Sequence, residues 1–319
     1  MLFKLDIIAS NWGLNSKYAL KPGHPRKIYY GDFGQNGRLG LVESYFNEAM
    51  TKEVPDRGLQ AVGRALAWVM KGVGTFEKYG EMSVQEIYDD KLSNAGVLEV
   101  NTLASMVFFN RGKRFESALL PQVAQLAPAF GICVGDCDGD GIEDIFLSQN
   151  FFATAPDTAR CDAGRGLWLR GIGNGRFQPL EGQDSGVLVY GEQRGCALSD
   201  YDGDGRVDLV VTQNGAETKL YRNVGGKSGL RVRLKGPGGN PNGIGASLRL
   251  VFGTRMGPQR EVHAGSGYWS QNSAVQVMGI PEPPTQIWVR WPGGKETNAD
   301  IPRGAKEITV DLSGKVEIR

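Results

Sequence analysis

Short runs of β-branched and aromatic residues, bounded by turn residues, recur along the chain. The clearest pair covers residues 142–150 and 206–214, where each run follows an Asp-x-Asp-Gly-Asp-Gly loop and ends in Gln-Asn. Such runs are typical of strands that leave a tight loop. A glycine turn followed by an aromatic residue also recurs, at residues 110–115 and 171–177. The pattern predicts a mainly β protein.

One stretch has a different periodicity. Leu59, Val62, Leu66, Val69 and Met70 fall at helical spacing, and residues 83–86 have the form of a helix capping box. Residues from about 55 to 92 are therefore expected to form a helical insertion in the β scaffold.

The strand runs and their loops form repeats. Asp136 and Asp200 begin two matching loops 64 residues apart, and an earlier copy begins at Asp32. Self-similarity on this scale indicates a propeller or a solenoid, with several strands to each unit. Residues 5–11 match the end of a unit, with Asp6 in the place of Asp144 and Asp208. We therefore expect an N-terminally truncated β-propeller, the C-terminal portion of a longer protein.

Composition supports the β assignment and excludes some partners. Glycine, at 46 of 319 residues, occurs about twice as often as average and favours tight turns between short strands. The net charge of +1 provides no general attraction for nucleic acid or an anionic membrane. No apolar run is long enough to span a membrane, and residues 1–10 do not have the form of a signal peptide.

The four cysteines do not form a recognisable scaffold. Cys133, Cys137, Cys161 and Cys196 are irregularly spaced, which argues against a zinc site built on paired Cys-x-x-Cys motifs. Structural or free thiols are expected, and a bridge between Cys161 and Cys196 is left open, since sequence alone cannot establish it.

The two acidic loops carry the strongest chemical signal. Each has carboxylates at its first, third, fifth and ninth positions, and a main-chain carbonyl is available at the seventh. Calcium favours such hard oxygen ligands, and glycine permits the turn that wraps them around the ion. The bland alternative is an acidic surface turn without an ion. An EF-hand is excluded because Leu147 and Val211 stand at the twelfth position and a strand follows. The expected ligands are Asp136, Asp138, Asp140, Ile142 (main-chain oxygen) and Asp144, and Asp200, Asp202, Asp204, Arg206 (main-chain oxygen) and Asp208.

These loops resemble the FG-GAP or VCBS repeats of integrin-α-like β-propellers. The resemblance covers about residues 1–225 and implies calcium at the eight aspartates of the two loops. The copy at Asp32 has Gly34 and Gly40 where the others have carboxylates, so a third site is expected to be degenerate. We expect residues 1–227 to form the propeller portion.

A second module is expected at residues 228–319. Apolar and basic residues alternate at 229–236, as in a half-exposed strand, and similar alternation returns at 286–291 and 307–312. The motifs at 240–246, 265–271 and 290–294 resemble the ASPIC/UnbV domain, which follows FG-GAP repeats in proteins such as cartilage acidic protein and its bacterial relatives. A small β-sandwich-like domain is expected.

Function is expected to be recognition. Tyr268, Trp269 and Trp291 are predicted either to pack under glycine turns or to form an exposed aromatic platform for a protein or polysaccharide. A catalytic pair of Ser266 with His263 is disfavoured, because the sequence around the serine is not a nucleophile elbow.

The sequence is compatible with three functions. The first is a calcium-binding, non-catalytic adhesion or recognition protein, secreted, periplasmic or on the cell surface, because extracellular modules bind calcium too weakly to be filled in the cytosol. The second is a polysaccharide-active lyase or hydrolase, with Glu192 and Asp184 as candidate acids. The third is a purely structural secreted scaffold.

Overall fold

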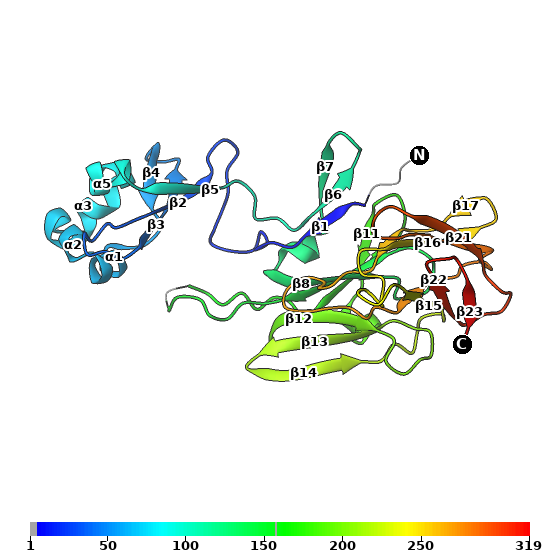
Figure 1. Ribbon diagram of the computed structural model, residues 1–319. Coiled ribbons are helices and arrows are strands. Elements are labelled where there is room, and N and C mark those ends of the chain that lie inside the picture. Colours follow the sequence, from blue (N-terminus) through cyan, green and yellow to red (C-terminus); the bar gives the residue numbers. More distant parts are fainter. Residues whose placement is uncertain (1–4, 157) are drawn as a thin grey trace. The chain divides into compact units, whose positions relative to one another are not determined.

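A computed structural model describes residues 5–156 and 158–319 and is mainly β, with antiparallel sheets and short helices (Figure 1). The chain divides into two compact units. One consists of Met1–Ser16 together with Ala104–Arg319, and the other of Lys17–Leu103. The second unit is thus an insertion in the sequence of the first.

Three antiparallel sheets make up the first part of the larger unit. The first sheet has the order β1-β6-β7, the second β11-β10-β9-β8 and the third β12-β13-β14. Their strands are β1 (Ile7–Ala9), β6 (Met106–Asn110), β7 (Phe115–Leu119), β8 (Ala129–Gly135), β9 (Asp144–Gln149), β10 (Leu167–Gly171), β11 (Phe177–Pro179), β12 (Glu192–Ser199), β13 (Asp208–Asn214) and β14 (Ala216–Tyr221). Short helical turns, η1 (Gln122–Gln125) and α6 (Gly182–Ser185), lie in the connections.

One hydrogen bond recurs in all three sheets. An aspartate at the start of a strand accepts it from a backbone N–H at the end of the next strand or just beyond. The bonds run from Asn110 N to Asp6 Oδ1 at 2.7 Å, from Gly171 N to Asp144 Oδ1 at 2.8 Å and from Asn223 N to Asp208 Oδ1 at 2.8 Å. Asp6 therefore takes the place in the first sheet that the sequence match with Asp144 and Asp208 predicts.

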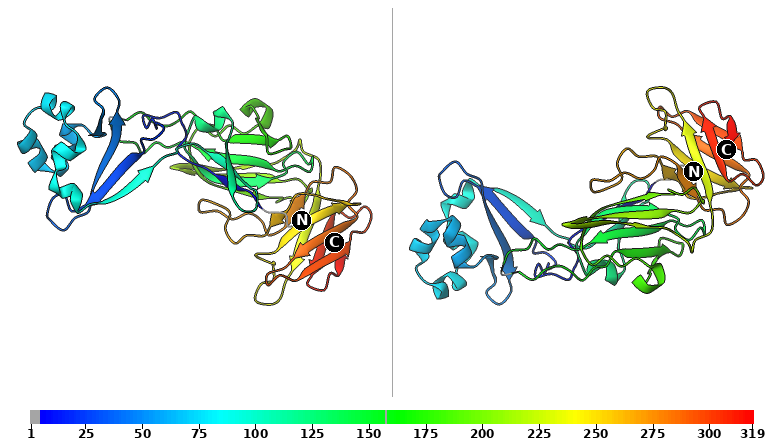
Figure 2. Two further views of the ribbon diagram at one scale, coloured as in Figure 1. Left: turned by 90° about the horizontal axis from the view of Figure 1, so that it is seen from above. Right: turned by 90° about the horizontal axis from the view of Figure 1, so that it is seen from below.

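The second sheet is buried on both faces. Side chains alternate along β9, so Ile145 and Leu147 pack into the cluster shared with the first sheet while Phe146 packs into the cluster shared with the third. All six residues of β9 are buried. Figure 2 shows strands of the second and third sheets lying side by side, and β8 and β12 are in contact. β9 is the central strand of this part of the fold.

Two cysteines meet between β8 and β12. Cys133 Sγ lies 3.3 Å from Cys196 Sγ, both residues are buried, and all four cysteines are free thiols. The backbone of Cys161 instead pairs with the backbone of Phe151 in an isolated β-bridge. The bridge between Cys161 and Cys196 that the sequence left open is therefore wrong, because Cys196 faces Cys133.

The C-terminal region consists of two further sheets around one core. Their orders are β19-β15-β22-β23 and β17-β16-β20-β21, with β18 also paired to β16. The strands are β15 (Leu230–Lys235), β16 (Ser247–Phe252), β17 (Arg255–Met256), β18 (Arg260–Glu261), β19 (Gln276–Met278), β20 (Gln286–Arg290), β21 (Glu296–Asp300), β22 (Glu307–Asp311) and β23 (Val316–Ile318). Val232 and Ile308 from one sheet share this core with Leu248 and Ile287 from the other.

The inserted unit combines a sheet with helices. Its sheet has the order β4-β3-β2-β5, from β2 (Arg26–Gly31), β3 (Gly40–Asn47), β4 (Lys52–Pro55) and β5 (Gly96–Val100). The helices are α1 (Leu59–Ala65), α2 (Ala67–Val73), α3 (Phe76–Glu81), α4 (Val84–Tyr88) and α5 (Asp90–Ser93). The predicted capping box at Ser83 and Glu86 is present. The compact unit extends beyond the helical stretch because β5 pairs with β2, which closes a separate core.

These helices are short, at most seven residues. In the part of the chain that the structure describes, no helix has the length and apolar character needed to cross a membrane.

Candidate metal centres

Each of two hairpins is closed by an acidic loop, one between β8 and β9 and the other between β12 and β13. Two glycines in each loop have a positive φ, 74° and 86° at Gly139 and Gly141, and 79° and 82° at Gly203 and Gly205. Side chains disfavour this conformation, so the glycines allow the loop to curl back on its first residue.

The first aspartate of each loop organises the turn. Its two carboxylate oxygens accept three backbone N–H bonds, and the distances in the two loops are the same. Asp136 accepts from Gly139 at 2.8 Å, Asp140 at 3.1 Å and Gly141 at 2.8 Å, and Asp200 accepts from Gly203 at 2.8 Å, Asp204 at 3.1 Å and Gly205 at 2.8 Å. The two loops therefore share one fold, set by the shared Asp and Gly positions.

Three carboxylates converge in each loop. Oxygens from the three side chains lie within 4.8 Å of one another in both groups, which are Asp136, Asp138 and Asp144, and Asp200, Asp202 and Asp208. Like charges at this separation repel, and a hard cation such as calcium would relieve the repulsion. The donors are all oxygen atoms, so they fit calcium or another hard divalent ion and not a soft one.

Burial makes the cluster costly without a cation. Asp136 and Asp144 are only 4 % and 3 % exposed, and burial raises the pKa of Asp136 to about 6 and that of Asp144 to about 7. Burial also raises the pKa of Asp208. These carboxyl groups resist ionisation while the loop holds only its own charges, and metal binding would compete with their protons.

The aspartate at the fifth position of each loop forms hydrogen bonds within the loop itself. Asp140 and Asp204 are not among the converging triads. Asp140 Oδ1 accepts a hydrogen bond from Ile142 N at 2.8 Å, and Asp204 Oδ1 accepts one from Arg206 N at 2.9 Å. These two side chains hold the second half of each loop. The ligand roles predicted for Asp140, Ile142, Asp204 and Arg206 stay predictions.

Two arginines complete the sites, and sequence reasoning missed both. Arg170 Nε lies 2.6 Å from Asp138 Oδ2, and Arg222 Nε lies 2.6 Å from Asp202 Oδ2. Each arginine directly precedes the residue whose N–H donates to the aspartate at the ninth position of the loop, so both arginines occupy the same place in their sheets. The matching positions of Arg170 and Arg222 in the two repeats are the sequence signal that could have identified them. The arginines neutralise carboxylates that a bound ion would neutralise instead.

This arrangement predicts competition between arginine and ion. We expect Arg170→Gln to increase the calcium affinity of the first loop by a few-fold, because it removes a positive charge beside Asp138. Calorimetric titration measures the effect, and Arg222→Gln should act in the same way on the second loop. Unchanged or weaker binding in both variants would contradict the competition.

The C-terminal region packs against both loops. Lys227 N donates to Asp138 O at 3.0 Å, and Gly229 N donates to Gly205 O at 2.7 Å. Arg231 forms an ion pair with the Asp200 carboxylate. A Cβ atom added to Gly279 would lie 1.7 Å from Asp136 Oδ2, so only glycine fits there. The linker and the C-terminal domain thus fix the positions of the acidic loops.

The copy at Asp32 retains the hydrogen bonds of the loop but not the cluster of carboxylates. Its carboxylate accepts from Asn36 N at 3.0 Å and from Gly37 N at 2.7 Å, as the equivalent residues do in the other loops. Gly34 and Gly40 provide no carboxylate. Within residues 5–156 and 158–319, the converging acidic triads are confined to the other two loops.

The three aromatic residues considered for partner binding differ in their exposure to solvent. Trp291 is 2 % exposed and donates from Nε1 to Thr297 Oγ1 at 3.0 Å, so the packing alternative applies and a direct contact with a partner is excluded. Tyr268 is 41 % exposed and packs its edge on Phe130. Trp269 is 92 % exposed, with a φ of 49° that is unusual for a residue with a side chain. Tyr268 and Trp269 remain available to a partner.

Two of the candidate catalytic residues, Glu192 and Ser266, have structural partners. Burial acts to raise the pKa of Glu192, but hydrogen bonds from Phe152 N, Asn214 and Arg194 outweigh it, and the pKa lies below its usual value. Asp184 is exposed in α6. Ser266 Oγ accepts from Asn272 N at 2.7 Å. These contacts account for Glu192 and Ser266 as parts of the fold.

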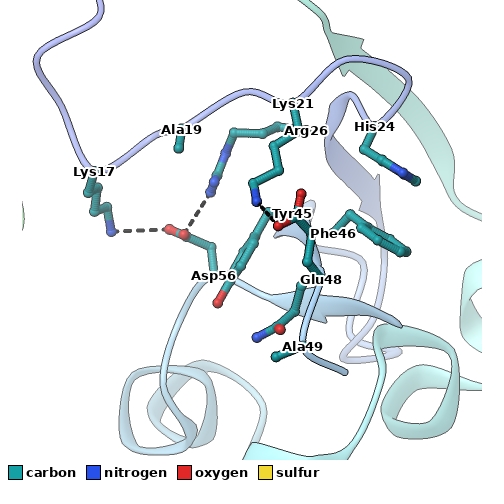
Figure 3. A pocket seen from close by; sticks show the side chains of 11 residues that line it. Lys17, Ala19, Lys21, His24, Arg26, Tyr45, Phe46, Glu48, Ala49 and Asp56 are labelled. Carbon is teal, nitrogen blue, oxygen red and sulfur yellow. Dashed lines mark hydrogen bonds and ion pairs between the residues drawn. The ribbon is translucent and has the colours of Figure 1, made fainter. Parts of the chain in front are cut away.

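The inserted unit has a hollow of about 480 Å³ lined by several cations (Figure 3). Lys17 and Arg26 both point to Asp56, at 3.1 and 2.6 Å, and Lys21 pairs with Glu48. Because acids within the hollow pair with these cations, it offers little net charge to an anionic ligand.

Comparison with known proteins identifies the C-terminal domain. Residues 236–316 match the family model described as ASPIC and UnbV, so the chain carries a C-terminal ASPIC/UnbV domain. No curated protein matches the chain. Among solved structures, one described as "Streptogramin B lyase structure" aligns over 98 % of this chain and 93 % of that chain with 12 % identity and a TM-score of 0.20. A TM-score this low supports no conclusion about fold or activity.

Proposed function

We propose that this chain is a calcium-stabilised, non-catalytic recognition protein in which the three sheets are propeller-type blades of the FG-GAP kind. The observation that carries the proposal is the pair of acidic loops with matching hydrogen bonds, each bringing three carboxylates within 4.8 Å. A divalent ion would balance that charge and fix each loop.

The position of the loops defines what the ion would do. Each loop joins two strands of a sheet and also contacts the linker at Lys227 or Gly229. An ion there would hold the hairpin and the start of the C-terminal domain together. Its role would therefore be structural, to present a rigid surface for binding.

Recognition is proposed for the loop that carries Trp269. An exposed indole on a constrained loop offers a large apolar contact at a small entropic cost, which is typical of residues that dominate binding to a protein or a sugar. Calcium affinities of about 10⁻⁴ to 10⁻³ M are usual in extracellular modules and support an extracytoplasmic location.

Calcium titration tests the metal assignment. We expect calorimetry to give two sites, and calcium at about 100 times the Kd to stabilise the protein by about 2.7 kcal/mol for each site. Asp144→Asn and Asp208→Asn should each remove one site, whereas Asp184→Asn, in the exposed helix α6, should remove neither. An unchanged unfolding temperature on addition of EDTA to calcium-loaded protein would reject the assignment.

A second measurement separates recognition from a scaffold or an enzyme. We expect saturable binding to a member of a glycan or protein array and its loss in Trp269→Ala. Turnover of a polysaccharide that is abolished by Glu192→Gln would instead support the enzyme, and binding to no ligand would support the scaffold.

A further inference from the structure

Among residues 5–156 and 158–319, the first sheet has no counterpart of the strands β8 and β12 of the other two sheets. In the second sheet β8 pairs with β9, and in the third β12 pairs with β13, each immediately before the acidic loop. β1 is the equivalent of β9 and β13, yet among the described residues it pairs with β6 alone. One edge of β1 therefore presents backbone groups without a neighbouring strand.

The hydrogen bonds of the Asp6 carboxylate also differ from those of Asp144 and Asp208. The second carboxylate oxygen of Asp144 accepts from Cys137 N at 2.8 Å, and that of Asp208 accepts from Tyr201 N at 3.1 Å. Both donors are the second residue of an acidic loop. Asp6 Oδ1 is bonded to Asn110 N, but within residues 5–156 and 158–319 no such donor reaches its Oδ2.

A groove of about 960 Å³ lies beside this edge. Ile8 and Phe109 from the first sheet and Ile132 and Val134 from β8 contribute apolar side chains to it. Val134 is 42 % exposed although β8 is otherwise largely buried. The groove thus combines a free strand edge with an apolar wall, which is the surface that a further β-strand requires.

We propose that the free edge of β1 binds a β-strand of the repeat's own type: an extended segment that runs antiparallel to β1 into an Asp-x-Asp-Gly-Asp-Gly loop. Backbone bonds to β1 provide the pairing, and alternate apolar side chains fill the groove against Val134 and Ile132. The second residue of the incoming loop donates its N–H to Asp6 Oδ2, as Cys137 does for Asp144.

The specificity of the site follows from Asp6. Any β-strand can form backbone hydrogen bonds to the edge of β1. Only a strand that ends in the acidic loop also places an N–H donor at the Asp6 carboxylate. The pairing depends on backbone groups and one carboxylate, so it does not need the ions proposed above. Failure of the calcium titration would leave it intact, and failure of strand binding would leave the calcium sites intact.

A synthetic peptide tests the proposal on the full chain. The probe has the sequence of residues 192–205, which form β12 and its loop, with Cys196→Ala to prevent oxidation. In the parent fold Leu198 N turns away from β13 and donates to Asn272, so the amides on either side face the paired strand. The control peptide therefore also carries Ala197→Pro, which removes one of these pairing donors.

The expected result is saturable binding of the probe by fluorescence anisotropy, with slower amide hydrogen exchange at residues 7–10. The control peptide should bind at least about tenfold more weakly. Binding without protection of β1, equal binding of both peptides, or no binding would each overturn the proposal.

Two protein variants locate the site. Asp6→Ala removes the carboxylate, and Val134→Lys places a charge in the groove at a position that is already 42 % exposed. Both variants are expected to bind the probe about tenfold or more weakly than the parent protein, while their unfolding temperatures stay within a few degrees of that of the parent. Undiminished binding to both folded variants would reject the site.

Discussion

Trp291→Ala is expected to destabilise the C-terminal domain by about 3–5 kcal/mol, the usual cost of removing a large aromatic side chain from a packed core. Trp291 is 2 % exposed and belongs to the core shared by the two C-terminal sheets. Alanine would leave a cavity there and orphan the hydroxyl of Thr297, which accepts the indole N–H at 3.0 Å. Such a loss is a large part of the stability of a small domain.

Amide hydrogen exchange resolves this effect to the domain concerned. Exchange in β16 and β20 should accelerate strongly in Trp291→Ala, whereas exchange in α2 and α4 of the inserted unit should not change. Trp269→Ala is the matched control, because it removes the same side chain from a position that is 92 % exposed. Its effect should stay within about 0.5 kcal/mol. Comparable acceleration in both variants would contradict the core assignment.

The acidic loops could be foreseen from sequence because their geometry is local. Asp136 and Gly141 are five residues apart, and the hydrogen bond between them closes the turn that the spacing predicts. The match of Asp6 to Asp144 succeeds for a related reason. Each aspartate bonds to a neighbouring strand of its own sheet, so the motif carries the contact with it.

The partners of the loops could not be foreseen because they come from distant segments. Arg170 reaches Asp138 across a strand, and Arg260 reaches Glu143 from another sheet, 117 residues along the chain. Neither pairing follows from local spacing. The size of the inserted unit was missed likewise, since its extent is set by the long-range pairing of β2 with β5.

The burial of Trp291 illustrates the limit for single residues. Its sequence context of proline and glycine turn residues is the same whether the indole points inward or outward, and only the two facing sheets decide the direction. The exposure of Trp269 is equally a property of the assembled loop. For such residues, turn chemistry predicts the backbone and not the direction of the side chain.

The ion pair between Glu143 and Arg260 joins the first acidic loop to the C-terminal domain. Arg260 Nε lies 2.7 Å from Glu143 Oε1, and Arg260 Nη2 lies 3.0 Å from Glu143 Oε2. The Arg260 side chain is 11 % exposed and the Glu143 side chain is 24 % exposed. Glu143 directly precedes Asp144, so this contact also positions a carboxylate of the metal cluster. The pair is therefore expected to matter for both the domain contact and the loop.

Breaking this pair from one side should cost about 3 kcal/mol, because Glu143→Gln or Arg260→Met leaves the other group largely buried without its partner. The double variant Glu143→Leu with Arg260→Met should cost less than the sum of the single changes, since neither charge remains. Hydrogen exchange in β9 and β18, followed through a double-mutant cycle, measures the coupling. The pair of Arg255 with Glu282 is the matched control, with a 2.6 Å contact but side chains 56 % and 55 % exposed. Its coupling should stay below about 1 kcal/mol, because water screens an exposed pair. Equal coupling in the two pairs would show that burial does not set the strength of the contact between the loop and the domain.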